Sequence, residues 1–181
     1  MDEPRAASYW ARPMADDQSP NLVIAPEGAA DADRAEALVD RVFGPGRYAK
    51  AAERLREGNH ALQGLSFVAR EGERLVGTVR MWPVRIGDAE ALLLGPIAVD
   101  PEARRRGLGV ALSAKACEAA AVAGHERVVL VGDLSFFERI GFEAVEPGRI
   151  RMPGPADPRR VLVRALTQGA WDGVQGEAAL P

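Results

Sequence analysis

The sequence is poor in cysteine, histidine and tyrosine, with one, two and two copies among 181 residues. The single cysteine, Cys117, excludes an intrachain disulfide framework and a zinc site made of several cysteines, so a reducing, cytoplasmic location is expected. The two histidines, His60 and His125, are isolated from each other, and no metal site is expected. No run approaches the roughly 18 apolar residues that cross a membrane, so no membrane partner is expected.

Neither sign of charge dominates, because 23 Lys and Arg stand against 26 Asp and Glu, for a net charge of -3. Nucleic-acid binders obtain affinity mainly by neutralising phosphates, so no nucleic-acid partner is expected. A hydrophobic share of 47% and a charged share of 27% are typical of a globular protein. We expect a loose leader over residues 1–20, a single domain over 21–176 and a C-terminal tail over 177–181.

Hydrophobic spacing predicts a mixed α/β fold. Strands are expected at 21–25, 65–70, 75–85, 91–99, 127–131, 142–145 and 159–166, and helices at 31–43, 47–57, 107–123 and 134–140. The second and third strands flank a turn and are expected to pair antiparallel. The helix at 107–123 joins two strands in a crossover, which makes those strands parallel. Gly95-Pro96 predicts a bulge within the first of them.

The most informative segment runs from a strand ending at Val99-Asp100-Pro101, through a loop, into the helix that begins near Gly107. The first turn of a helix has backbone N–H groups without intrahelical partners, which suit phosphate oxygens. Gly107 and Gly109 would let a diphosphate approach the backbone, and positive charge comes from Arg104, Arg105 and Arg106. A solvated loop is the alternative interpretation of these arginines.

Two common phosphate-binding patterns do not match this loop. Val110-Ala111 stands where a nucleoside-triphosphate loop needs Lys followed by Ser or Thr. Leu112 stands where a dinucleotide-binding loop needs its third glycine. A coenzyme A site is the interpretation that is left.

The pattern Arg104-x-x-Gly107-x-Gly109 resembles the acyl-CoA loop of the GNAT superfamily of N-acetyltransferases. Three further segments are similar to a bacterial GNAT subfamily that reads Val-Gly-Asp, then Tyr-Tyr-x-Arg-Phe-Gly-Phe. These segments are Leu94 to Val99, Val131-Gly132-Asp133 with Phe136-Phe137-Glu138-Arg139 and Gly141-Phe142, and Met152 to Asp157. The resemblance covers about residues 21–176.

The resemblance implies a mixed, mostly antiparallel sheet with a central, splayed pair of parallel strands flanked by helices. It also implies acetyl-CoA or another acyl-CoA as cosubstrate, and direct attack on the thioester by the amine of a small-molecule or protein acceptor. Ile97 and Val99 would offer backbone groups to pantetheine, and an N–H near Ala98 would stabilise the oxyanion. The diphosphate would be surrounded by Arg104, Arg105, Arg106, Gly107, Leu108, Gly109 and Val110.

The tyrosine with which this family frequently protonates the departing thiolate is replaced here by Phe137. Ser135 or an ordered water is the alternative acid. For the base, Glu138, Asp133, His60 and an amine that arrives deprotonated all stay open. The missing hydroxyl also motivates an alternative function, an acyl-CoA-binding sensor or interaction module with little turnover.

Other candidates have a plain structural interpretation beside the functional one. Arg47 and Tyr48 lie on the link between the first two helices, which caps the acceptor entrance in GNAT folds, but a solvated turn would contain them equally well. Phe136 either borders the acceptor pocket or packs in the core with Phe137. Cys117 faces an alanine-rich helix surface and is expected to be a buried apolar residue, not a nucleophile. The acceptor, the acyl length and the oligomeric state, for which a homodimer is one option, stay open.

Overall fold

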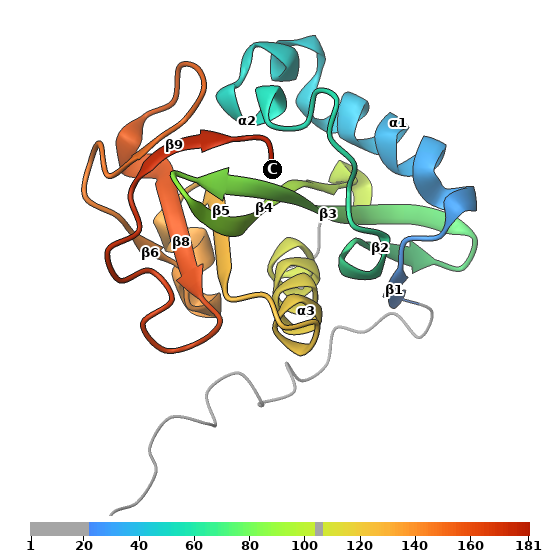
Figure 1. Ribbon diagram of the computed structural model, residues 1–181. Coiled ribbons are helices and arrows are strands. Elements are labelled where there is room, and N and C mark those ends of the chain that lie inside the picture. The colour runs from blue at the N-terminus through green and yellow to red at the C-terminus, as the bar shows by residue number, and fades with distance from the viewer. Residues whose placement is uncertain (1–21, 104–106) are drawn as a thin grey trace, which may run out of the picture.

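The computed structural model describes residues 22–103 and 107–181 (Figure 1). The expected leader at 1–20 and the three arginines Arg104, Arg105 and Arg106 lie outside the described residues. Within the described part the strands form one mixed sheet in the order β1-β2-β3-β4-β5-β8-β6, with β9 beside β3 and β7 beside β9. The strands are β1 (Leu22–Pro26), β2 (Phe67–Glu71), β3 (Arg74–Ile86), β4 (Ala89–Val99), β5 (Arg127–Val131), β6 (Glu143–Ala144), β7 (Ile150–Arg151), β8 (Val161–Ala165) and β9 (Gly176–Ala179).

Helices cover both faces of this sheet, with α1 and α2 on one side and α3 on the other (Figure 1). They are α1 (Ala32–Phe43), α2 (Ala51–Arg54), α3 (Leu108–Val122) and α4 (Leu134–Phe137). Short 3-10 turns occur at Ala29–Asp31, Pro45–Ala49, Gln63–Leu65, Pro101–Ala103, Glu138–Ile140 and Pro158–Arg160. This arrangement confirms the predicted fold class. In the described part of the chain, no helix combines the length and the apolar character that a bilayer crossing requires.

The crossover helix α3 packs closely on the sheet because its inner face carries only apolar and small residues. Leu108, Leu112 and Ala116 are buried in one core cluster with residues of β2, β3, β4 and β5. Gly77 on β3 permits this approach, since a Cβ there would lie 2.8 Å from Leu112 Cδ1. The apolar spacing in the sequence therefore predicted this helix and its buried face correctly.

The predicted bulge at Gly95-Pro96 is confirmed by the register of β4 against β3. Val79 faces Ile97, whereas Met81 faces Leu94, so β4 contains one extra residue between these two pairs. An extra residue reverses the alternation of side chains along a strand. Leu92 and Leu94 therefore face the core under α3 before the bulge, and Ile97 and Val99 pack against that core after it.

The parallel strands β4 and β5 pair over a short length only. The register joins Leu92 to Val128 and Leu93 to Val129, and no pair of these strands is recorded nearer their carboxyl ends. The two strands thus separate toward their carboxyl ends, where β4 leads into the loop before α3. This is the splayed parallel pair that the resemblance implied.

Two local expectations were wrong. The helix expected at 47–57 is replaced by a 3-10 turn and the single-turn α2, because Lys50 between them has extended backbone angles, φ -80° and ψ 142°. The tail expected at 177–181 is largely β9, which pairs antiparallel with β3 through Arg85 and Ile86. Ala178 in β9 is buried, so this contact with a distant strand orders the segment.

Candidate active site

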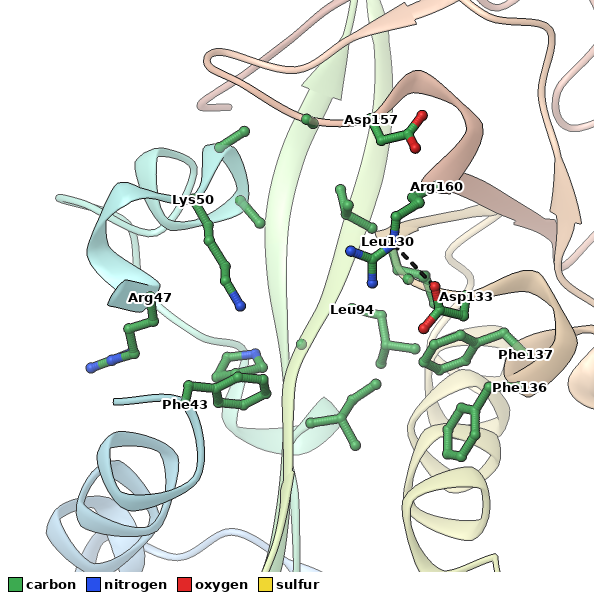
Figure 2. Close-up of a pocket in the computed structure, with 18 of the residues that line it drawn as sticks. Phe43, Arg47, Lys50, Leu94, Leu130, Asp133, Phe136, Phe137, Asp157 and Arg160 are labelled. Carbon is green, nitrogen blue, oxygen red and sulfur yellow. Dashed lines mark ion pairs between the residues drawn. The ribbon is translucent and has the colours of Figure 1, made fainter. Parts of the chain in front are cut away.

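A cavity of about 460 Å³ opens where β4 and β5 separate (Figure 2). Four parts of the chain form its walls: the bulged half of β4, the end of β5 with α4, the segment from the end of α1 to Arg56, and the segment 155–160 before β8. Residues that line it include Phe43, Lys50, Arg56, Leu94, Ile97, Asp133, Phe136 and Phe137. Figure 2 shows Phe43 and Lys50 on one side of β4, and Asp133 with both phenylalanines on the other.

Among the described residues, the backbone of β4 beyond the bulge has no strand partner on the side that faces this opening. The N–H of Asp100 donates a hydrogen bond of 2.8 Å to the carbonyl of Val76 on β3. In an antiparallel ladder alternate residues direct both backbone groups to the same neighbour, so Ala98 also faces β3. The backbone groups of Ile97 and Val99 then face the open side, whereas the N–H of Ala98 does not point there; binding of pantetheine by Ile97 and Val99 stays a prediction. Ile97 is also the member of this trio that lines the cavity.

The start of α3 lies next to the same cavity. Gly107, with φ 97°, is the N-cap residue and provides no side-chain cap, so the first-turn N–H groups have no such acceptor. A Cβ on Gly109 would lie 3.3 Å from Phe136 Cζ and 3.6 Å from Ile97 Cγ2. Leu108 is buried in the core and Val110 is partly exposed. Binding of a diphosphate by this turn and by the three preceding arginines stays a prediction.

The strand end before the loop is held by the buried carboxylate of Asp100. It accepts hydrogen bonds from the N–H of Glu102, at 3.0 Å, and from the guanidinium groups of Arg74, at 2.9 Å, and Arg41, at 3.0 Å. The N–H of Glu102 and the charge of Arg74 lower the pKa of Asp100 below its ordinary value. This side chain therefore ties the beginning of the glycine loop to α1 and β3.

Phe137, which the resemblance aligns with the family's usual acid, is 7% exposed and lines the cavity. Its ring packs edge-on against Phe136 and Phe142, with centroids 4.9 and 5.8 Å away. Gly132 makes room for it, since a Cβ there would lie 2.6 Å from Phe137 Cε2. The aromatic core thus fixes this ring at the cavity without any hydroxyl.

The two proposed catalytic polar residues are not brought to the cavity. Ser135 and Glu138 are exposed, and neither is among the lining residues. Asp133 does line the cavity, and its Oδ1 lies 3.2 Å from Nε of Arg160, the ion pair drawn in Figure 2. Among the described residues, no three His, Cys, Asp or Glu side chains are grouped closely enough to hold a metal ion.

Cys117 is fully buried in α3, as its position in the sequence predicted. Burial raises the pKa of its thiol to about 11, so the sulfur is protonated near neutral pH. A protonated, buried thiol is a poor nucleophile.

Arg47 belongs to a chain of ion pairs and is not free to contact an acceptor. Its Nε lies 2.9 Å from Asp40 Oδ1, it also pairs with Glu36, and its Nη1 lies 3.6 Å from Glu53 Oε2. Burial opposes its charge, but hydrogen bonds with Tyr48 and Glu36 raise the pKa of Arg47 above its ordinary value. Figure 2 shows its guanidinium pointing away from the cavity.

Tyr48 supports Arg47 and does not line the cavity. Its hydroxyl accepts a hydrogen bond of 3.0 Å from Arg47, whose guanidinium lies 4.4 Å from the ring centre. The side chain is 54% exposed. Of the four substrate-side candidates, the structure therefore brings Phe136 and Phe137 together in the cavity, keeps Arg47 in its wall as a paired group, and leaves Tyr48 outside.

The ion-pair chain continues in both directions from Arg47 and alternates in sign. On one side Glu36 also accepts from Arg80 Nη1, at 2.8 Å, and Arg80 binds Glu27 through Nη2, at 2.7 Å. On the other side Glu53 Oε2 accepts from Arg56 Nη1, at 2.9 Å. The chain thus runs from Glu27, just after β1, through β3 and α1 to α2, and its last member, Arg56, two residues after α2, lines the cavity.

Sequence reasoning missed Lys50 and Arg56 as cavity residues. The helix expected over 47–57 would expose both side chains to solvent. The break at Lys50 instead turns this segment toward β4. Lys50 reaches into the cavity, with Nζ 5.1 Å from the ring centre of Phe43 (Figure 2). The sequence offered one signal for these two residues, their closeness along the chain to Arg47 and Tyr48. The resemblance had placed Arg47 and Tyr48 near the acceptor entrance.

Comparisons with known proteins agree with this geometry. Residues 63–144 match the family model described as "Acetyltransferase (GNAT) domain". The chain is 30% identical over 157 residues, 86% of its length and 93% of the relative's, to an uncharacterized N-acetyltransferase, YhbS, of Escherichia coli strain K12.

Solved structures of similar proteins support the same conclusion. A crystal structure of Escherichia coli YhbS in complex with CoA has a TM-score of 0.76 and 28% identity, and the match covers 92% of this chain and 93% of that one. A GNAT acetyltransferase from Brucella melitensis in complex with acetyl-CoA has a TM-score of 0.65 and 27% identity, with coverage of 88% and 96%. The extent of this similarity, together with the splayed strands and the cavity between them, shows that the chain belongs to the GNAT family of acyl-CoA-dependent N-acetyltransferases.

Proposed function

We propose that this protein transfers an acetyl group from acetyl-CoA to a primary amine that enters the cavity between the α1–α2 link and α4. The amine nitrogen bonds to the thioester carbon, the carbon–sulfur bond breaks, coenzyme A leaves as the thiolate, and the amine gives up one proton. The observation that carries the proposal is the open edge of β4 at Ile97 and Val99, which adjoins a cavity with room for an acceptor. We infer further that the chain belongs to the bacterial subfamily with the Val-Gly-Asp motif.

In this mechanism the chain mainly binds and orients the two substrates. The open backbone groups of Ile97 and Val99 take the pantetheine arm, and the first turn of α3 takes the diphosphate. The N–H of Ile97 is better placed than that of Ala98 to stabilise the oxyanion, because the strand pairing turns Ala98 toward β3. Arg104, Arg105 and Arg106, next to that turn in the sequence, add positive charge for the phosphates.

Few protein groups are placed to protonate the leaving thiolate or to accept the proton of the amine. A thiol with a pKa of about 8.5 leaves as an anion without help at neutral pH, so Phe137 slows the reaction without preventing it. A general acid contributes about 10²- to 10⁴-fold. Asp133 is a carboxylate that lines the cavity, and a water that it holds would accept the amine proton more readily than Glu138, which does not line the cavity. Ser135 does not line it either.

The test is to incubate the protein with acetyl-CoA and a panel of primary amines, and to measure both thiol release and the mass of the acetylated product. Amine-dependent thiol release with a product 42 Da heavier, the mass of acetyl replacing hydrogen, is the expected result. The packed ring of Phe137 favours one alternative, an acyl-CoA-binding sensor with little turnover. Tight binding of acetyl-CoA without transfer to any amine in the panel would support that alternative.

A further inference from the structure

The carboxylates that line the cavity already have cationic partners. Asp133 pairs with Arg160, with 3.2 Å between Oδ1 and Nε. Asp157 pairs with Arg159, whose Nη2 lies 2.9 Å from Oδ2. Neither acid therefore neutralises the remaining cations of the cavity.

Two cavity cations, Lys50 and Arg56, lack a full set of anionic partners. No ion pair of Lys50 is recorded within the described residues, and its amine lies above the apolar ring of Phe43. Arg56 makes one side-chain hydrogen bond in the described part of the structure, from Nη1 to Glu53. That carboxylate is shared, since the same Oε2 also lies 3.6 Å from Arg47 Nη1.

The guanidinium of Arg56 is held in an unusual position for an arginine. Its side chain is only 13% exposed, and its Nε is buried without a hydrogen-bond partner. Its Nη2 lies 3.7 Å from the position that a Cβ would take on Gly95, so this edge of the guanidinium borders the bulge of β4. Burial lowers the pKa of Arg56, because the desolvated charge is only partly compensated by Glu53. An anion beside Nη2 would supply the missing compensation.

We propose that Arg56, with Lys50, binds a carboxylate of the acceptor, so that the substrate is a small molecule with a primary amine and a carboxylate. A guanidinium edge is suited to a planar carboxylate because its N–H groups are fixed in one plane. Apolar residues that line the cavity, Leu94 and Pro96 on β4 and Phe136 on α4, suit a short hydrocarbon chain between the two groups. A cavity of about 460 Å³ selects a small molecule over a folded protein.

This inference rests on the proposed acetyl transfer, and matched pairs of acceptors test it. ω-Amino acids with three to six carbons are compared with the unbranched alkylamines of the same length, whose amines have similar pKa values. For the best chain length we expect kcat/KM to be about tenfold or more higher for the amino acid, mainly through KM. That size follows from one or two hydrogen bonds between charged groups.

Variants of Arg56 and Lys50 then test whether these residues cause the preference for the amino acid over the alkylamine. Arg56→Gln should bring the ratio of the two kcat/KM values close to one, Lys50→Gln should lower it partly, and Arg56→Lys should restore part of it. Because the ratio compares two substrates of one preparation, incomplete folding of a variant does not change it. Arg54→Gln is the control, since Arg54 lies two residues before Arg56, at the end of α2, but is exposed and does not line the cavity. It should leave the ratio unchanged.

A binding measurement decides the inference even if no amine is acetylated. Pentanoate and pentylamine are titrated by calorimetry into the protein saturated with coenzyme A. The wild type should bind pentanoate more tightly than pentylamine, and Arg56→Gln should lose that difference. Failure of acetyl transfer with pentanoate binding intact would contradict only the proposed function. Equal rates for the paired acceptors, an unchanged ratio in Arg56→Gln, or absence of pentanoate binding would overturn the carboxylate site.

Discussion

Replacement of Gly109 by glutamate should abolish coenzyme A binding while the protein stays folded. Gly109 is the second residue of α3, and its φ lies outside the left-handed region, so a side chain is compatible with the backbone. Its Cβ would lie 3.3 Å from Phe136 Cζ, and Phe136, which is 43% exposed, has room to shift by the few tenths of an ångström required. Replacing a helical glycine stabilises the helix by roughly 0.5 to 1 kcal/mol. An acidic group in the first turn stabilises it by about 0.3 to 1 kcal/mol more.

The loss in binding follows from the charge. Two unit charges about 4 Å apart repel by about 4 kcal/mol at an effective dielectric constant of about 20. Since about 1.4 kcal/mol corresponds to a tenfold change in the dissociation constant, the affinity for coenzyme A should fall by about a thousandfold. Thermal stability should stay near the wild-type value or rise slightly, because both local effects on the helix are favourable.

Calorimetric titration with coenzyme A and a thermal melt of each variant measure these two quantities. Gly109→Gln is the control, because its side chain has nearly the same size and no charge. It should weaken binding much less than Gly109→Glu if the carboxylate repels the diphosphate. A folded Gly109→Glu protein with wild-type affinity would show that the diphosphate does not bind at the start of α3.

Three further predictions concern other parts of the site. Cys117→Ala should keep most of the acetyl transfer, because the buried thiol is protonated near neutral pH; complete loss of steady-state activity with coenzyme binding and thermal stability retained would contradict this. Phe137→Tyr should raise kcat or leave it unchanged, with an increase only if thiolate departure limits the rate and the hydroxyl reaches the sulfur; a folded, coenzyme-binding but inactive variant would make Phe137 a packing or acceptor-shaping residue. Asp100→Asn should weaken coenzyme A binding in calorimetry, because the neutral side chain holds Arg74 and Glu102 less firmly at the loop. The lowered pKa of Asp100 also predicts that its contribution to stability is present above its ordinary value of 3.8 and is lost as the pH falls through the lower folded value, which acid unfolding of wild type and Asp100→Asn would compare.

The sequence predicted the central part of the fold because its signals there are local. Apolar residues at helical spacing between Gly107 and Gly124 predicted α3, and five consecutive residues around Val129 predicted β5, each within one residue of its observed bounds. Gly95-Pro96 predicted the bulge of β4, since this pair interrupts an apolar strand. A crossover between two such strands leaves few alternatives for their relative direction.

The same reasoning was wrong where distant parts of the chain decide the conformation. β9 forms because Ala178 is buried beside Ile86 on β3, a contact between residues about half the chain apart. The expected helix at 47–57 is broken at Lys50, where the backbone is extended, and Arg47 before the break pairs with Glu36 and Asp40 of α1. Helical spacing alone contains no information about either contact.

The sequence by itself determined that this chain has a strand–loop–helix segment suited to a diphosphate, and that Cys117 and Phe137 provide no nucleophile and no acid. These conclusions depend on residue types and on spacing along the chain. Only the tertiary structure decided which charged groups reach the acceptor space. Arg47 is neutralised by partners up to eleven residues away, whereas Arg56 keeps one edge of its guanidinium at the bulge. Burial and pairing determine whether a cation is available to a substrate, and both are set by groups that meet only when the chain folds.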